Sequence, residues 1–238
     1  MRRLLIDQGN SRIKAAWDGP EGIDYLGTAE KVDELVSIIK DQPSSIWLSS
    51  VAAGNQQQQL LDAIESYWGV PATRVRIADY QAHLSTAYRP DQLGVDRWLA
   101  MLAGVPGDNL SALVVDAGTA ITVDTVVRGR HEGGYILPGL TLTREALLSG
   151  TAIDLPGEDR VGSCEALATE TGAAISQGMP LAVVALVERL FAGIRDPQPV
   201  IIGGGDAHRL AACLQVPHVI VENLVLKGLS RLALLEEG

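Results

Sequence analysis

Two short segments carry an aspartate and a glycine in the same order, and both have residues suited to holding phosphate groups. The first is Asp7-Gln8-Gly9-Asn10-Ser11, and the second is Asp116-Ala117-Gly118-Thr119-Ala120. Glycine in a turn lets backbone amides approach a phosphate closely, because no Cβ intervenes. A carboxylate at the end of a strand can hold Mg²⁺ directly or through water. Taken alone, each segment is equally compatible with an ordinary hairpin turn and a solvated aspartate.

The first segment is followed by more groups that suit a phosphate site. Asn10 and Ser11 add side-chain donors, and Lys14 can offset charge on a transferring phosphoryl group. Two such loops, gripping the β- and γ-phosphates from both sides of a cleft, would supply the positioning and charge neutralisation that phosphoryl transfer requires. We therefore expect the two loops to act on one nucleotide.

A third group, Gly94-Val95-Asp96-Arg97, stands where a helix is expected to begin. One interpretation is a helix cap with a surface ion pair, which contributes little. The other makes Asp96 a general base that accepts the proton of an attacking hydroxyl. Arg97 and the helix N-terminus would then hold an anionic group of the substrate.

The run Ile201-Ile202-Gly203-Gly204-Gly205-Asp206-Ala207 indicates a buried strand that ends in glycines and leads into a helix. Such a turn can pack flat against a nucleotide, although a generic strand-to-helix turn has the same appearance. It lacks the G-x-G-x-x-G spacing and the following acidic residue of a dinucleotide-binding unit. The P-loop pattern G-x-x-x-x-G-K-[ST] and the protein-kinase signatures are also absent.

The surrounding pattern predicts an α/β chain whose two halves begin alike. Apolar runs and turn residues predict strands at 3–7, 12–17 and 25–28, and again at 113–116, 121–127 and 133–137. Asp7 and Asp116 thus end the first strand of each half, with a tight Gly9-Asn10 turn and a Gly118-Thr119 turn after them. The breaker cluster at 106–109 marks a boundary, which gives lobes of residues 1–108 and 109–238.

The remaining elements follow from apolar spacing. The sequence predicts further strands at 46–51, 75–77 and 200–202. It predicts helices at 32–40, from Gln56, from Gly94, and at 140–149, 171–192 and 224–235.

Composition limits the class of protein. The formal net charge is −10 with no basic stripe, so a nucleic-acid partner is not expected. No signal-peptide core and no apolar run long enough to span a bilayer are recognised, which indicates a cytoplasmic protein. Cys164 and Cys213 form no CxxC pair, so a disulfide framework is not indicated, and their spacing to His208 and His218 fits no common zinc pattern.

Taken together, these motifs resemble the type III pantothenate kinases of the acetate and sugar kinase/Hsp70/actin superfamily. The resemblance runs nearly end to end. Its motifs are D-x-G-N-[TS] at 7–11, G-x-D-R at 94–97, D-x-G-T-A at 116–120, G-G-x-I-x-P-G at 133–139, T-x-x-A-I-x-x-G at 171–178 and G-G-D-A at 204–207. It implies an actin-like ATPase architecture of two ribonuclease H-like lobes. Ser11 stands where threonine is usual in this family, and it keeps the hydroxyl.

The resemblance also implies an activity, which is ATP-dependent phosphorylation of pantothenate to 4′-phosphopantothenate at the start of coenzyme A biosynthesis. It makes Asp96 the catalytic base. Asp116 would hold a monovalent cation, K⁺ or NH₄⁺, and Asp7 would hold Mg²⁺. The ATP-binding residues would be Asp7, Gln8, Gly9, Asn10, Ser11, Arg12, Ile13, Lys14 and Thr119. The pantothenate-binding residues would be Tyr88, Gly94, Val95, Asp96, Arg97 and Thr171.

Family membership further implies a homodimer with the substrate site completed across the interface. Two other functions stay open at this point. One is a non-catalytic regulator of the Bvg accessory factor type, which the joint retention of Asp7, Asp96 and Asp116 disfavours. The other is a kinase of a different small hydroxylated acid or sugar, against which only the G-x-D-R motif and Thr171 speak.

Overall fold

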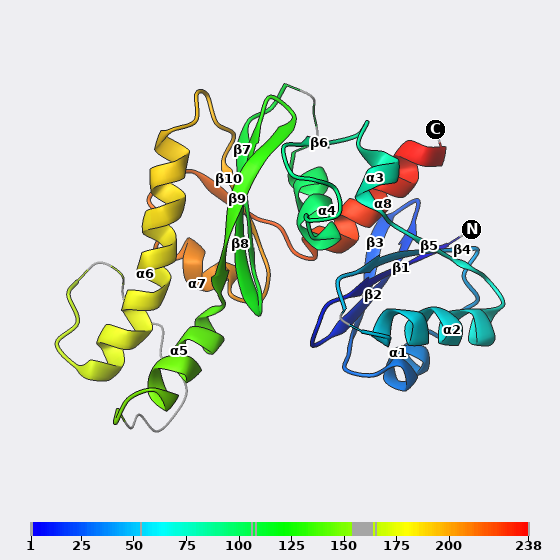
Figure 1. The fold of residues 1–238 in the computed structure, drawn as a ribbon, viewed down its shortest axis with the longest axis horizontal. Coiled ribbons are helices and arrows are strands. Elements are labelled where there is room, and N and C mark those ends of the chain that lie inside the picture. The colour runs from blue at the N-terminus through cyan, green and yellow to red at the C-terminus, as the bar shows by residue number, and fades with distance from the viewer. Residues whose placement is uncertain are drawn as a thin grey trace. The chain divides into compact units, whose positions relative to one another are not determined.

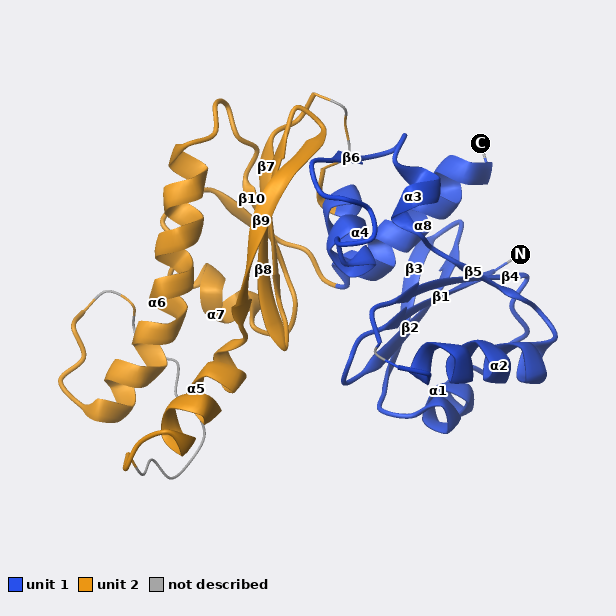
Figure 2. Cartoon of the chain, in the orientation of Figure 1, with its two compact units in different colours: residues 1–103, 223–238 blue, residues 104–222 orange. Residues whose placement is uncertain are grey.

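The computed structural model describes residues 2–52, 54–105, 107, 109–153, 164 and 166–237. The chain divides into two compact units, shown in different colours in Figure 2. Unit 1 consists of residues 1–103 and 223–238, and unit 2 consists of residues 104–222.

A mixed sheet forms the centre of unit 1. Its order is β3-β2-β1-β4-β5, in which β1, β2 and β3 run antiparallel and β4 and β5 run parallel to β1. Leu4, Leu5 and Ile6 are fully buried, as expected for a central strand covered on both faces. The strands are β1 Arg3–Gln8, β2 Ile13–Gly19, β3 Gly22–Ala29, β4 Ser45–Ser50 and β5 Ala72–Arg74.

Helices cover both faces of this sheet (Figure 1). On one face, α2 buries Leu60, Ile64 and Trp68 at helical spacing, and Gly69 ends it in the left-handed conformation. The strand predicted at 75–77 is wrong, because β5 ends at Arg74 and Ile77 opens a short helix. The other elements are α1 Val32–Ile38, α2 Gln56–Trp68, α3 Ile77–Tyr80, β6 Ser85–Thr86, α4 Val95–Gly104 and α8 Leu224–Glu237.

The strands of unit 2 repeat the arrangement of unit 1. Within the unit their order is β9-β8-β7-β10-β11, again with the first three antiparallel and the last two parallel to the central strand. The predicted α/β fold with two ribonuclease H-like lobes is therefore confirmed. The strands are β7 Ala112–Ala117, β8 Ala120–Val127, β9 Arg130–Pro138, β10 Val200–Gly203 and β11 His218–Ile220.

The described part of unit 2 also contains three helices, α5 Leu140–Ser149 and α6 Thr171–Ala192 between β9 and β10, and α7 Ala207–Ala211 between β10 and β11. The helix α6 packs against β7 and α7 through Val183, Val184 and Val187. By length and composition alone α6 would span a membrane, which corrects the expectation that no such run exists. Core helices of soluble proteins pass the same test, so this one helix is weak evidence of a membrane protein.

The C-terminal helix belongs to unit 1, whereas the sequence predicts a second lobe that runs to residue 238. The helix α8 packs on β1, β2 and β4, and the Ser230 hydroxyl donates to the buried Asp18 carboxylate at 2.9 Å. Gly228 lets α8 cross the backbone of α4, because a Cβ there would collide with the Leu99 carbonyl oxygen. Burial raises the pKa of the Tyr80 hydroxyl in α3, and Glu236 of α8 adds to that rise.

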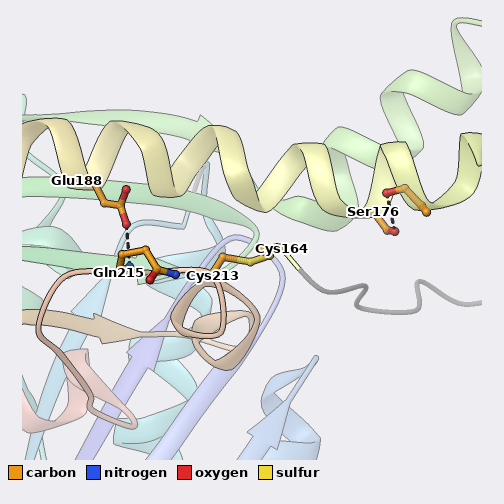
Figure 3. The surroundings of a disulfide bond; sticks show 6 residues. Cys164, Ser176, Glu188, Cys213 and Gln215 are labelled. Carbon is orange, nitrogen blue, oxygen red and sulfur yellow. Dashed lines mark hydrogen bonds between the residues drawn. A yellow bond between two sulfur atoms is a disulfide. The ribbon is translucent and has the colours of Figure 1, made fainter. Parts of the chain in front are cut away.

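A disulfide joins Cys164 to Cys213 within unit 2, which the composition did not indicate (Figure 3). The two Cα atoms are 5.4 Å apart, and Cys213 is buried in the unit 2 core. The full length of α6 lies between the two cysteines in the sequence. Their spacing therefore gives no sign that the chain returns to bring them together.

Candidate active site

The first glycine turn, residues 9–12, borders a hollow of about 270 Å³ in unit 1. The Gly9 N–H donates to the Arg12 carbonyl at 2.9 Å, and Gln8 pairs with Ile13 across the turn. The turn thus spans four residues rather than the predicted two, and β2 begins at Ile13 instead of at 12. Residues 8–13, all predicted to bind ATP, line this hollow.

Asp7 stands next to this turn and is held by the neighbouring strand. In the sheet it pairs with Lys14 of β2 on one side and with Ser49 of β4 on the other. The buried Ser49 hydroxyl donates to Asp7 Oδ1 at 3.0 Å. Directly paired residues in neighbouring strands point to the same face, so a carboxylate, an ammonium group and a hydroxyl are gathered together.

Gln8 faces the other way and secures the turn. Its amide oxygen accepts from the Ser50 hydroxyl at 2.8 Å, and its amide nitrogen donates to the Gln56 carbonyl at 3.3 Å. The side chain is buried. Gln8 therefore ties the loop to β4 and to the start of α2.

Other residues of the same hollow escaped the sequence motifs. They come from the end of β3 and from the beginnings of α1 and α2, which the sheet order brings beside the turn. Lys31 adds a second ammonium group to this wall, and no short motif includes it. These additional residues are Glu30, Lys31, Val32, Gln56 and Gln59.

The second glycine turn joins β7 to β8 in unit 2. Ala117 pairs with Ile121, and the Gly118 N–H donates to the Ala120 carbonyl at 3.0 Å, so the turn is one residue shorter than the first. Asp116 pairs with Thr122 on one side and with Gly203 on the other. Asp116 thus holds the same place in unit 2 that Asp7 holds in unit 1.

Two glycines from separate motifs press on this second turn. The Gly139 N–H donates to the Thr119 carbonyl at 2.9 Å, and a Cβ on Gly139 would collide with that carbonyl oxygen. Gly204 has φ +90°, and a Cβ there would collide with the backbone of Ala117. The motifs at 133–139 and 204–207 are therefore explained by close backbone approach to the loop that follows Asp116.

Asp96 lies in the first turn of α4, in unit 1. The Asp96 Oδ1 atom accepts the Arg97 backbone N–H at 2.8 Å. The same oxygen occupies the space that a Cβ on Gly94 would fill. The buried Arg97 guanidinium lies over the Tyr88 ring, 5.3 Å from its centroid. The predicted substrate residues 88 and 94–97 are thus brought together in unit 1.

The segment that carries Tyr88 is fixed to α4 by a buried hydrogen bond. The Trp98 indole N–H donates to the Leu84 carbonyl at 2.9 Å. The Thr86 hydroxyl accepts the Tyr88 N–H at 3.0 Å. Thr171, the remaining predicted substrate residue, is the exposed first residue of α6 in unit 2.

The carboxylates that could bind a metal ion do not cluster in the described part of the chain. No cluster of three or more His, Cys, Asp or Glu side chains that could hold a metal ion occurs in the described part of the chain. A site with one carboxylate fits Mg²⁺, which commonly binds one or two carboxylates and substrate phosphates while keeping several waters. Asp7, fixed by Ser49, has the chemistry for such a site.

Two ribonuclease H-like units, each with an aspartate and a glycine turn after its first strand, define a protein with the actin-like ATPase fold. Solved structures agree with this fold. A protein from Campylobacter jejuni described as a Baf family transcriptional activator superposes with a TM-score of 0.66 over 98% of both chains, at 22% identity. The ethanolamine utilization protein EutJ from Carboxydothermus hydrogenoformans gives 0.55 at 10% identity, over 98% of this chain and 89% of its own.

The sequence comparisons are more specific. The family model for type III pantothenate kinase matches residues 3–193. The type III pantothenate kinase of Chromobacterium violaceum is 36% identical over 97% of this chain and 99% of its own length. That of Marinobacter nauticus is 37% identical over 97% of each chain. The chain belongs to the type III pantothenate kinase family.

Proposed function

We propose that this chain transfers the γ-phosphoryl group of ATP to the primary hydroxyl of pantothenate. The product is 4′-phosphopantothenate, and the reaction opens coenzyme A biosynthesis. Full-length similarity to curated type III pantothenate kinases carries this conclusion. The geometry at the start of α4 supports it, because an aspartate, an arginine and a tyrosine are gathered there by short contacts.

Asp96 is the general base of the reaction. Its carboxylate accepts the hydroxyl proton of pantothenate while the hydroxyl oxygen bonds to the γ-phosphorus. The bond from that phosphorus to the bridging oxygen breaks, and ADP leaves with the electron pair. The absence of a Cβ at Gly94 leaves the carboxylate free to lie at the helix N-terminus.

Arg97 and Tyr88 orient the acceptor in this proposal. The guanidinium offers planar donors that match the carboxylate of pantothenate, and the ring beneath it restricts its movement. Val95 and Thr171 are further pantothenate contacts. The bound acceptor is held by its charged end, so that its hydroxyl meets Asp96.

ATP is bound through the residues 7–14 and through Thr119. The backbone amides of the first turn and the ammonium group of Lys14 contact the phosphates. Asp7 holds Mg²⁺, directly or through water, and this ion neutralises charge on the β- and γ-phosphates when it is bound. Asp116 holds a monovalent cation, K⁺ or NH₄⁺, beside the second turn.

The decisive experiment measures turnover of pantothenate and ATP, with Mg²⁺ and K⁺ present, for the native protein and for Asp96→Asn. Removing the base lowers kcat by at least about 10²-fold, with an unchanged thermal melt. Asp91→Asn is the matched control, because this exposed carboxylate pairs with Arg89 and should leave the rate unchanged. Near-native turnover of Asp96→Asn would remove Asp96 as the base.

The same assay separates the remaining alternatives. A non-catalytic regulator would show no turnover with any alcohol acceptor. A kinase of another small acid or sugar would show a larger kcat/KM for that acceptor than for pantothenate.

The proposed assembly is a homodimer that works in the cytoplasm. The homodimer is supported by large apolar side chains that are exposed on unit 2. Tyr135 and Ile136 of β9 are 53% and 64% exposed, and Leu142 of α5 is 47% exposed. Ile136→Asp should convert the dimer to monomers in sedimentation, whereas Val219→Asp, also exposed on unit 2, should not. A native protein that sediments as a monomer would contradict the proposal.

A further inference from the structure

A second and larger hollow lies within unit 2, away from both glycine turns. Its volume is about 600 Å³, within the usual range for small-molecule sites. It is bounded by the β8–β9 turn at Arg128, by the last turn of α6 at Arg189, and by Arg195 just beyond α6. We call it the arginine hollow. Figure 1 shows the end of α6 and the β8–β9 turn at the same end of the unit 2 sheet.

The charge of the arginine hollow is opposite to that of the protein. The chain carries a formal net charge of −10, yet three arginines and a single acidic residue, Asp196, line this site. Within the described residues, none of the three arginines forms an ion pair with a carboxylate. Three arginines beside one carboxylate give the hollow an excess of positive charge, which on an acidic protein favours an anionic ligand.

The backbone that presents these arginines is held in place. The Arg128 N–H donates to the Ser111 hydroxyl at 3.0 Å, and the Gln198 N–H donates to the Ser111 carbonyl at 2.7 Å. Ser111 is buried and thus ties the β8–β9 turn to the segment that follows α6. The two walls of the hollow are therefore fixed relative to each other before any ligand arrives.

Local backbone strain is concentrated at the same place. In the described part of the chain, three non-glycine residues have positive φ, and two of them, Arg128 at +50° and Asp196 at +51°, line the arginine hollow. Two-residue hairpin turns such as the one at Arg128 favour Asn or Gly, so a bulky residue is unfavourable there. Strain of this kind gathers at ligand-binding positions.

One feature of the fold opposes an anion here, because the C-terminal end of α6 carries partial negative charge. That effect is small and is confined to the last turn of the helix. The Leu190 and Phe191 carbonyls already accept the N–H groups of Gly193 and Ile194. A charge complementary to the helix end would explain Arg189 and Arg195, but it would not explain Arg128 of the β8–β9 turn.

We propose that the arginine hollow binds a small metabolite that carries phosphate next to an apolar portion. Guanidinium groups match phosphate oxygens in pairs, and three exposed arginines line this hollow, one from the β8–β9 turn, one from the last turn of α6 and one just beyond it. The Val127, Leu190 and Ile194 side chains supply the apolar wall. The hollow lies at the opposite end of β8 from Thr119, a separation of about 25 Å along the strand, so it is a site distinct from the second glycine turn.

The test is calorimetric titration of the full-length protein with inorganic pyrophosphate, in which the arginine variants separate binding at the arginine hollow from binding at the nucleotide site. The native protein should bind pyrophosphate, and Arg128→Gln/Arg195→Gln should weaken binding at least tenfold. Arg189→Gln is the second variant. Arg130→Gln is the matched control, because Arg130 pairs with Glu132, does not line the hollow, and should leave the affinity within twofold.

Turnover of pantothenate in the hollow variants should stay within twofold of native without pyrophosphate, so loss of the proposed reaction and loss of this site are separate results. Equal pyrophosphate affinity in the native and double-variant proteins, or no binding by the native protein, would overturn the proposal. Citrate bound as tightly as pyrophosphate would overturn the assignment to phosphate.

Discussion

The two glycine turns occupy the same position in two units of the same topology, but they are braced in different ways. In unit 1 the strand beside Asp7 offers Ser49, whose hydroxyl donates to the carboxylate. In unit 2 the strand beside Asp116 offers Gly203, which has no side chain. There the bracing comes from backbone contact, since Gly139 and Gly204 press directly on residues 117–119.

The glycines at the tips of the two turns, unlike Gly139 and Gly204, have room for a side chain. Neither Gly9 nor Gly118 has a positive φ, and added Cβ atoms would lie 3.4 Å and 3.7 Å from the nearest atoms of the chain. The fold tolerates a side chain at both tips, so the fold itself does not require glycine there, which is compatible with the proposed role in binding phosphate. Two turns of similar chemistry can thus rest on different supports, and substitutions should affect them differently.

The largest expected effect is on the two aspartates. Asp7→Asn should lower kcat by about 10²–10³-fold, because it removes the charge that holds Mg²⁺ near the transferring group. Asp116→Asn should lower the rate less and abolish the difference between K⁺ and Na⁺. Steady-state turnover of both variants in both salts checks this. An Asp7→Asn protein that is only as impaired as Asp116→Asn would make the two turns equivalent.

A second prediction concerns the bracing of the second turn. Gly204→Ala should reduce the free energy of unfolding by about 3–5 kcal/mol, because the new Cβ meets the Ala117 backbone at positive φ. Gly118→Ala, the control on the same turn, should cost less than about 1 kcal/mol. Chemical denaturation measures both values, and similar losses in the two variants would show that bracing by Gly204 is unimportant.

The disulfide is a further difference between the two units, since both of its cysteines lie in unit 2. Cys164→Ser should lower the free energy of unfolding of the oxidised protein by about 2–4 kcal/mol, because the bond closes a long loop in the unfolded chain. A reductant should cause the same loss in the native protein and no loss in the variant. Free thiols titrated in the unreduced native protein would show that the bond is not formed.

The smallest predicted effect tests the brace of the first turn. Ser49→Ala should raise KM for Mg-ATP by about three- to tenfold with little change in kcat, which matches the net contribution of one typical hydrogen bond. Ser44→Ala is the matched control, because its exposed hydroxyl donates to the Arg2 carbonyl, away from the turn. If both serine variants raise KM equally, the Ser49–Asp7 bond has no special role.

Much of the fold was predictable because the signals are local. The central strands predicted at 3–7 and 113–116 end in Asp and are followed by a glycine turn, and the helix at 171–192 has the same bounds in the structure. Elements shaped by distant contacts were missed. The strand β11 is three residues long, and it exists because His218 and its neighbours pair with β10. The assignment of α8 to unit 1 likewise depends on packing that no local pattern records.

The residues of the candidate site likewise fall into two groups, those in contiguous motifs and those that the fold brings to the site. The residues 7–14 and 94–97 form two motifs, each contiguous in the sequence, so the chemistry of each motif can be predicted from the sequence alone. Ser49, Lys31 and Gln56 reach the first turn only through sheet order, and Gly139 and Gly204 reach the second turn in the same way. These residues matter because the fold places them next to the turns, and short sequence motifs do not predict such contacts.

The division of the chain also sets an order of events on the ribosome. Unit 2 is one uninterrupted segment, whereas unit 1 is completed only by residues 223–238. The face of the first sheet that α8 covers stays unprotected while the roughly 120 residues of unit 2 are synthesised. At translation rates of 5–20 residues per second, this interval lasts roughly 6–24 s, long enough for a chaperone to bind the nascent N-terminal sheet.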